Sequence, residues 1–399
     1  MNKASFAVSL AALSLGASLP AAPAAAAPPA AAEPAAPPPI VVTGVRIDYA
    51  RRQLEACIAR HCPTLEDIQA TLQYAEALFM SGDYRRARAT LKSSIGRNRS
   101  AAPQHPVAVA GLYRANARMA IHEGDGDDFR MSTYDVEHSL HAGLPRSDPR
   151  ILGARLETAD MHVSLHESDA AEQLYDAVAR DAGAIGRPDI AAVANLRHAM
   201  LAYHLKRTDA RARLEAIARL DGPQTRMLQL AARIALARID KDKGDGKAMD
   251  RLVAELAAQH VRAPVLLYAP AITVPTAATT SGFANVGGDA VEMRNMSTMM
   301  ATDSFDYWAD VGYWIGPDGH VSDVSVLRSR GPTFWLTPVV ASVSGRLYAA
   351  SGEAAAPAYR VERYRYTSLI ERASDTRIKA HSAQGRIEML DITAAPPGG

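Results

Sequence analysis

The sequence has little cysteine, almost no net charge and none of the common catalytic motifs. Its 399 residues include two cysteines and three tryptophans, and the formal net charge is +1. A chain so close to neutral carries no electrostatic argument for binding nucleic acid or an anionic membrane surface. It contains no P-loop, dinucleotide fingerprint, GxSxG or SxxK motif. We therefore expect a protein that works by binding, with no cofactor, metal or catalytic residue.

The N-terminal apolar run is shorter than the ~20 residues that a membrane span needs. Lys3 precedes this run, Phe6 to Leu19, and Pro20 and a tract of small residues follow it. This order is typical of a secretory signal peptide, here residues 1–26. We expect cleavage after Ala25 or Ala26 and export to the periplasm. An uncleaved inner-membrane anchor is the alternative, and membrane contact is expected only in that case.

The two cysteines, Cys57 and Cys62, lie close together in the sequence. In an exported chain such a pair usually forms a disulfide. Residues five apart in one helix are too distant for a bridge. The helix must therefore end between them, and Pro63 disfavours helical geometry at Cys62. A metal site of Cys57, His61 and Cys62 is the alternative, but it has no evident fourth ligand.

Residues 27–47 form a proline- and alanine-rich linker that carries one short apolar segment, "IVVTG". The composition of this linker cannot build a core and predicts an extended tether.

Residues 48–262 have helical periodicity interrupted by short polar turns. Four of these turns are centred at positions 42 residues apart, and a fifth follows 36 residues later: Gly82, Gly124, His166, Thr208 and Gly244. Five helix–turn–helix units at near-constant spacing predict a helical solenoid.

The first unit, "YAEALFMSGDYRRARATL", resembles a tetratricopeptide repeat. The positions that carry the resemblance are Ala75, Gly82, Tyr84 and Ala87, with Ala171 and Tyr175 in the third unit. The resemblance implies a stacked scaffold whose concave face binds a protein or peptide. A scaffold that only connects other elements is the alternative.

The composition changes near Ala263, and all three tryptophans lie beyond this point. We interpret residues 263–305 as a connector and residues 306–370 as a small α+β domain. In "VGYWIGPDGHVSDVSVL", two strands flank a turn in which proline, aspartate and glycine have their usual places. A helix capped by Thr337 with Pro338 at its first position and a strand from Tyr359 to Thr367 follow. Residues 371–399 predict a final hairpin, turning near Gln384–Gly385, and a disordered tail.

The order "VxYxIxPDGxVSDVxVLRSxG" resembles the C-terminal domain of TonB-type energy transducers. The matching residues are Pro317, Asp318, Gly319, Val321, Val324, Val326, Ser329 and Gly331. "GRLY", Gly345 to Tyr348, stands where the family has an arginine and an aromatic residue. The family's N-terminal anchor with its histidine is absent, since no histidine precedes His61. The expected fold is thus mostly α, with a smaller strand–strand–helix–strand domain.

"IVVTG" resembles the short box by which outer-membrane receptors engage the TonB domain, where an extended peptide adds to a sheet edge. The candidate ligand is Ile40, Val41, Val42, Thr43 and Gly44. The candidate edge is the strand that carries Val361, Arg363 and Arg365. The implied partners are envelope proteins or peptides, among them outer-membrane receptors or a copy of the chain itself. An apolar segment that packs on the first helix is the alternative.

His162 and His166 could face one metal from one helix. They lack the HExxH order, and the repeat pattern puts His166 in a turn, which favours a solvated pair. The sequence therefore predicts a periplasmic interaction or scaffold protein related to TonB-type transport, with an open groove and a free strand edge. The alternatives are a membrane-anchored energy transducer and an envelope enzyme with a site in the C-terminal domain.

Overall fold

The computed structural model describes residues 47–222, 225–258, 265–273, 307–349, 356–372 and 379–393. The expected signal peptide, the Ile40–Gly44 segment and most of the expected connector lie outside these residues. None of the described helices is both long enough and apolar enough to cross a membrane.

In the described residues, five helical hairpins follow a first helix, α1 (Ile47–Ala59). The hairpins are α2 (Thr64–Ser81) with α3 (Tyr84–Asn98), α4 (Pro106–His122) with α5 (Gly126–Gly143), α6 (Pro149–Ser164) with α7 (Ser168–Ala184), α8 (Pro188–His204) with α9 (Ala210–Ala218), and α10 (Arg226–Asp242) with α11 (Lys247–Ala258). A short 3₁₀ helix, η1 (Arg99–Ala101), follows α3. The predicted solenoid of five hairpins is confirmed.

The hairpin turns lie where the spacing of polar segments places them. Each turn has one residue in the left-handed region, which reverses the chain after a helix. These residues are Gly82 (φ 84°), Gly124 (77°), His166 (63°), Lys206 (56°) and Gly244 (96°). In the fourth turn the left-handed residue is therefore Lys206, two positions before Thr208. Aspartate follows the first two glycines and caps the next helix: Asp83 accepts from the Arg86 amide and Asp125 from the Asp128 amide.

Equivalent positions of successive hairpins make equivalent contacts. Buried alanines recur 42 residues apart in α2, α4 and α6, as Ala75, Ala117 and Ala159, and small side chains there let the helices pack closely. A charged position with the same spacing reaches the next hairpin turn. Its pairs are Arg88 with Asp125 (2.5 Å), Arg130 with Glu167 (2.6 Å) and, with the charges exchanged, Glu172 with Arg207 (3.4 Å).

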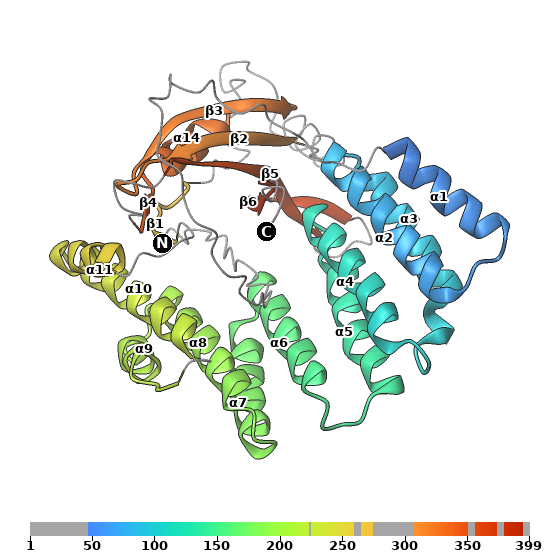
Figure 1. The fold of residues 1–399 in the computed structure, drawn as a ribbon, viewed down its shortest axis with the longest axis horizontal. Helices are drawn as coiled ribbons and strands as arrows, with labels where there is room; N and C mark the ends of the chain where they lie inside the picture. Colours follow the sequence, from blue (N-terminus) through green and yellow to red (C-terminus); the bar gives the residue numbers. More distant parts are fainter. Residues whose placement is uncertain are drawn as a thin grey trace, which may run out of the picture.

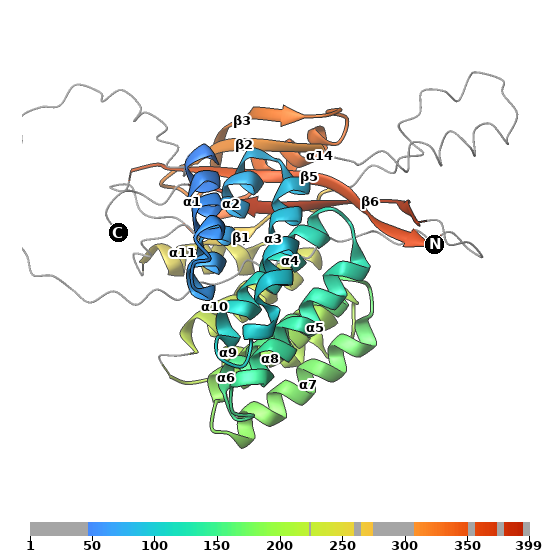
Figure 2. The ribbon, with the colours of Figure 1, turned by 90° about the vertical axis from the view of Figure 1, so that its right-hand side faces the viewer.

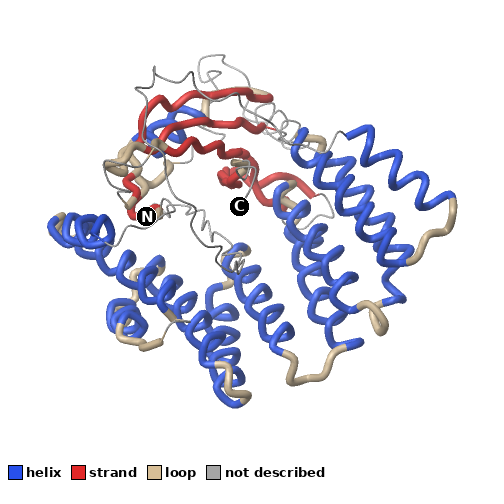
Figure 3. Tube along the Cα trace, viewed as in Figure 1, coloured by secondary structure: helices blue, strands red, loops and turns tan. Residues whose placement is uncertain are grey.

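The helices follow one another in an arc, and a sheet lies across the opening of that arc (Figure 1). Figure 3 shows the strands gathered on one side of the molecule with one short helix among them, and the helices of the solenoid around the remaining sides. The groove between the ends of the solenoid, which we predicted to be open, is thus spanned by the chain's own C-terminal domain.

The sheet is antiparallel with strand order β3-β2-β5-β6. Its strands are β2 (Tyr307–Ile315), β3 (Val321–Arg330), β5 (Ala358–Arg372) and β6 (Lys379–Asp391). The helix α14 (Leu336–Ser344) packs on one face. A second, two-stranded sheet pairs β1 (Leu266–Tyr268) with β4 (Leu347–Tyr348). The predicted strand–strand–helix–strand order is confirmed. In Figure 2, β3 and β2 lie at the top of the molecule, and β5 and β6 cross at the level of the upper parts of the first helices.

The two faces of the sheet have different chemistry because side chains alternate along each strand. Apolar and tyrosine side chains of β2 and β5 pack with α14: Ala309, Val311, Tyr313, Ile315, Tyr364 and Tyr366 meet Trp335, Val339 and Val343. The other face carries tryptophan, aspartate and arginine and is directed toward the solenoid.

Two local predictions are wrong. Gln384 and Gly385 lie inside β6, which pairs with β5 on both sides of a register shift at this point (Ser368 with Gly385, Ile370 with His381). No hairpin turn therefore forms there, and the C-terminal domain continues to Asp391. The helix α14 begins two residues earlier than predicted, at Leu336 in place of Pro338, and Thr337 does not cap it.

Candidate interaction surfaces

The strand expected to offer a free edge has none. β5 lies between β2 and β6, and at Val361 the backbone N–H donates to Thr393 Oγ1 (3.0 Å) while the carbonyl accepts from Ile392 (2.9 Å). The chain beyond β5 returns as β6 and occupies the edge. The side chains of Arg363 and Arg365 are not available on the surface either, because these residues are only 2% and 5% exposed.

Arg363 instead joins the sheet to the end of α2. Its Nη1 donates to the Phe79 carbonyl at 2.8 Å, and its Nε and Nη2 donate to Asp310 at 2.7 and 3.0 Å. The guanidinium carbon lies 4.4 Å from the ring centre of Trp308. A cation beside the last carbonyls of a helix is favoured by the helix dipole. Asp310 also binds Arg328 of β3.

The neighbouring contact joins β5 and β6 to α3 and α4. Arg365 stacks on Tyr84, 4.3 Å from the ring centre. A Glu388 carboxylate oxygen lies 2.6 Å from His122 Nδ1, and Glu388 forms an ion pair with Arg386 (2.8 Å). Burial alone would raise the pKa of Glu388, but the charges of His122 and Arg386 outweigh burial and lower this pKa to about 2. We call the contact of Trp308, Arg363, Arg365 and Glu388 with the first two hairpins the tip contact.

Two turn glycines let the sheet approach this closely. A Cβ at Gly82 would lie 2.7 Å from Trp308 Nε1, and a Cβ at Gly124 would overlap the Ser368 carbonyl. The Gly124 carbonyl also accepts from the Ile370 amide at 2.7 Å. His166 has the same left-handed backbone in the third turn, so the turn itself does not require glycine. Glycine at positions 82 and 124 is therefore explained by the docking of the sheet.

A second attachment lies at the other end of the solenoid. Apolar side chains of α10 and α11 pack around Leu267 of β1 and Ala349, which follows β4; they are Ile234, Ala237, Met249, Leu252 and Leu256. Arg238 Nε donates to the Leu267 carbonyl at 2.7 Å, and Lys241 Nζ lies 3.5 Å from the ring centre of Tyr268. We call this attachment the base contact.

The "GRLY" motif contributes to the interior of the C-terminal domain. Arg346 donates to Glu362 (2.9 Å) and to the hydroxyls of Tyr313 (2.9 Å) and Tyr364 (2.7 Å), and the Tyr313 and Tyr348 hydroxyls are 2.8 Å apart. Burial, with the Glu362 charge, raises the pKa of Tyr313 and Tyr364. The network therefore supplies hydrogen bonds to a buried ion pair between Arg346, which follows α14, and the sheet.

β3 provides the strand edge that β5 does not. In the described sheet β3 has one neighbour, β2, and Val326 and Leu327 are 39% and 44% exposed. Register shifts opposite Asp310/Val311 and Gly312/Trp314 divide β3 into short regular stretches.

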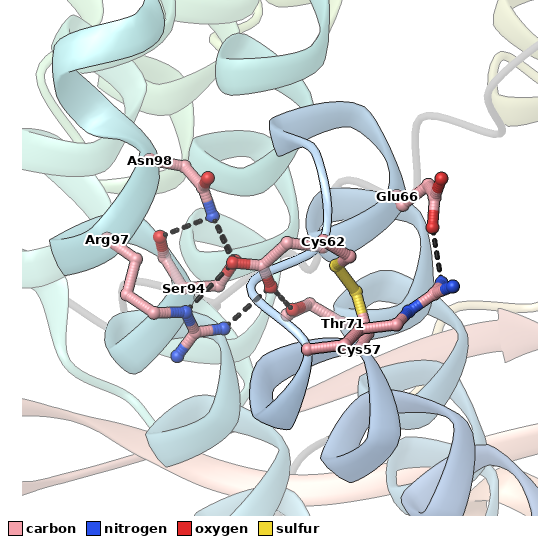
Figure 4. Close-up of a disulfide and its surroundings, with 9 residues drawn as sticks. Cys57, Cys62, Glu66, Thr71, Ser94, Arg97 and Asn98 are labelled. Carbon is pink, nitrogen blue, oxygen red and sulfur yellow. Dashed lines mark hydrogen bonds and ion pairs between the residues drawn. A yellow bond between two sulfur atoms is a disulfide. The ribbon is translucent and has the colours of Figure 1, made fainter.

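The predicted disulfide is present. α1 ends at Ala59, His61 turns the chain with φ 54°, and Cys57 and Cys62 bond with their Cα atoms 5.1 Å apart (Figure 4). Within the described residues, one set of three potential metal ligands lies together, and it consists of this pair and Glu66. Both sulfurs are in the disulfide, and Glu66 pairs with Arg60.

His162 and His166 do not form a solvated pair. His162 is buried, with Nδ1 2.6 Å from Glu167 and Nε2 3.4 Å from the Tyr134 hydroxyl. His166 lies in the turn, as predicted from the spacing. The role of His162 is to pack one hairpin against its neighbour.

Sequence reasoning missed Trp308, Asp310 and Glu388 as contact residues. One feature of the sequence indicated such a contact. In "VERYRYT", on β5, charged residues alternate with tyrosines, and a further strand follows β5 in the chain. Because a strand covered on both sides buries both of its faces, charged residues at alternate positions indicate a second, polar partner surface. The identity of that surface had no local signal.

No protein-family model matches the chain, and no curated protein matches it. Among solved structures, the chain is similar to BtubC (BKLC) from P. vanneervenii, with 19% sequence identity and a TM-score of 0.43, over 55% of this chain and 92% of that chain. A likeness at this level defines neither a shared fold nor a shared function.

Proposed function

We propose that this chain is an exported, non-enzymatic interaction protein of the cell envelope, related to TonB-type transport. Its solenoid holds the C-terminal domain, and this domain binds an extended segment of a partner protein at the outer edge of β3. The observation that carries the proposal is the ten-residue strand β3, which has one neighbour in the described sheet and exposed apolar side chains.

The physical basis is strand addition. An unpaired edge offers backbone N–H and C=O groups that an added strand can satisfy, and alternate side chains supply specificity. Val326 and Leu327 point to opposite faces and give an added strand apolar contacts on both. The register shifts of β3 favour a short segment, because a long strand could not keep regular pairing across them.

The candidate segment from this chain is Ile40–Gly44, whose β-branched residues favour an extended backbone. It lies outside the described residues. The same segment on a second molecule could bind to β3, and so could the equivalent box of an outer-membrane receptor, because both are short, extended and apolar. Competition between the two for β3 follows from the proposal.

Photo-crosslinking in the envelope tests this binding. A benzophenone amino acid at Ser325, which is exposed on β3, is expected to capture a partner. The variant Val326→Lys with Leu327→Lys is expected to reduce the adduct about tenfold, because lysine protects strand edges from pairing. Both side chains are exposed, so the loss of stability should remain within about 0.5 kcal/mol.

The control places the same benzophenone at Met131, an exposed residue of α5 that is remote from β3. Equal adducts from both positions, or an adduct at Ser325 that the lysine variant does not diminish, would contradict the proposal. The mass of the adduct separates a second copy of the chain from a receptor. If the protein recovered from the envelope is full-length and membrane-bound, the alternative of an anchored energy transducer is favoured.

A further inference from the structure

The C-terminal domain is attached to the solenoid at two places of unlike chemistry. We propose that it acts as a clasp: the tip contact opens while the base contact stays closed, which opens the arc on one side. This inference does not depend on the partner proposed for β3.

The base contact has the composition of a stable core. Leu267 is completely buried, and Met249, Leu252 and Leu256 are nearly so. Burial of such side chains stabilises a contact without any requirement for charge or exact pairing. Arg238 adds hydrogen bonds to the backbone of β1, which do not depend on the ionisation of a partner side chain.

The tip contact depends on buried charge. Glu388 is faced by His122 from α4, by Arg365 from β5 and by Arg386 on its own strand. The rings of Tyr84 and Phe79 flank His122. A buried ion pair gives little net stabilisation because both ions lose water, yet loss of one partner leaves an uncompensated charge.

The tip contact also leaves buried donors unpaired. Among the residues that the structure describes, Trp308 Nε1 and the Nε and Nη1 of Arg365 have no hydrogen-bond partner. Each buried unpaired donor opposes the closed state, because opening returns it to water. Although Trp308 also packs in the hydrophobic cluster of the first hairpins, these unpaired donors and buried charges lead us to infer that the tip contact opens before the base contact.

Opening of the tip contact would expose a surface that is buried in the closed state. The inward face of the sheet, with Trp308, Arg363 and Arg365, would become available to a partner that supplies carbonyl or carboxylate acceptors. The Phe79 carbonyl, at the end of α2, would lose its arginine. The clasp thus regulates access to a basic and aromatic surface that is buried in the closed state.

Distances between spin labels on the full chain test the proposal. A tip pair uses Arg85→Cys on α3 with Ser329→Cys on β3, and a base pair uses Arg251→Cys on α11 with His320→Cys beside β4; all four positions are exposed. The native disulfide remains oxidised, so only the introduced cysteines take labels. Each pair is measured in the parent chain and in Glu388→Gln, Gly124→Ala and Gly244→Ala.

Glu388→Gln removes the negative charge at position 388 and keeps the shape of the side chain, and Gly124→Ala introduces an overlap with Ser368. Both are expected to add a second, longer tip distance without changing the base distance. Gly244→Ala is the matched control, because Gly244 has a left-handed backbone and a Cβ added there would have no atom within 4 Å. It should keep the single tip distance.

Two results would overturn the clasp. In folded Glu388→Gln, an unchanged single tip distance would mean that the charge does not hold the contact closed. Tip and base distances that lengthen together would mean that the domain leaves the solenoid as one body. Circular dichroism establishes that each variant is folded, and Glu388→Gln remains decisive if Gly124→Ala does not fold.

Discussion

At the residue scale, a glycine in a turn can have two roles that sequence alone does not distinguish: it can adopt a left-handed backbone, or it can leave room for a neighbouring element. A glycine after a helix is usually explained by its left-handed backbone. His166 and Lys206 adopt that backbone without being glycine. The absence of a side chain at Gly82 and Gly124 therefore serves contact with the sheet, and this difference is measurable.

Gly82→Ala should destabilise the protein more than Gly186→Ala. Both glycines have positive φ (84° and 70°), so alanine costs about 1–2 kcal/mol of strain at either position. Only at Gly82 does the added methyl group meet Trp308, and overpacking of this kind costs roughly a further 1–3 kcal/mol. Urea titrations of the two variants give the comparison. Equal losses in the free energy of unfolding would show that Trp308 moves aside without cost.

At the element scale, the sequence predicted what local pattern determines. The turn spacing located five hairpins because each turn needs polar residues and one left-handed residue, which are visible in the sequence. "GPDG" located the hairpin of β2 and β3 for the same reason. The prediction of a late turn at Gln384–Gly385 failed because Gly385 resembles a turn residue, whereas in β6 it makes room for the Tyr366 ring.

The candidate site was much less predictable than the elements. Arg363 and Phe79 are separated by 284 positions along the chain, and no local pattern links them. The choice of edge strand failed similarly, because it depended on whether the residues after Arg372 return to the sheet. Strand order is a property of the whole domain, and the alternation within one strand does not determine it.

Loss of the disulfide should loosen α1 and leave the rest of the solenoid folded. The disulfide closes a short loop between α1 and α2, and the chain-entropy model assigns such a loop about 2 kcal/mol. α1 is the first helix of the stack, and its buried side chains are Ala50, Leu54 and Cys57. Ala50 and Leu54 pack in one hydrophobic cluster with side chains of α2 and α3. We expect faster amide exchange throughout α1 in Cys57→Ser with Cys62→Ser, and little change in α6–α8.

The matched control for that experiment is the parent chain after mild reduction without unfolding, which breaks the same bond and keeps both side chains. Faster exchange in α6–α8 in either sample would contradict the expectation. It would mean that α1 is required for the whole solenoid and not only for its first hairpin.

At the scale of the whole molecule, the solenoid and the sheet are interdependent. Repeat proteins gain stability from contacts between neighbouring units, yet here the first two hairpins and the last one also contact the C-terminal domain. In the closed arrangement, the stability of the first two hairpins and that of the last hairpin therefore depend on the same C-terminal domain. In the proposed clasp the charged tip contact is the attachment that opens, and protonation of Glu388 at low pH acts on this contact directly.

Lowering the pH should remove the stabilisation that Glu388 provides. The ordinary pKa of 4.5 falls to about 2 in the closed molecule. A carboxyl group with a lowered pKa stabilises the folded form fully above its ordinary pKa, and the contribution is lost as the pH falls through the folded value. The window of loss is therefore pH 4.5 down to about 2, and the upper bound is on the order of 3 kcal/mol, since each pKa unit is worth about 1.4 kcal/mol.

Comparison with Glu388→Gln isolates this carboxyl group from others that also lose their pairing in acid, such as Asp148 and Glu167, whose pKa values are lowered to about 2. Both chains should lose stability below pH 4.5. The difference between them, measured by urea unfolding, should be largest near pH 6 and should shrink steadily toward pH 3, because a protonated Glu388 resembles glutamine. A difference that stays constant over this range would mean that glutamine costs stability through its shape and not through the missing charge. The tip contact would then be closed by packing, and acid would not open it.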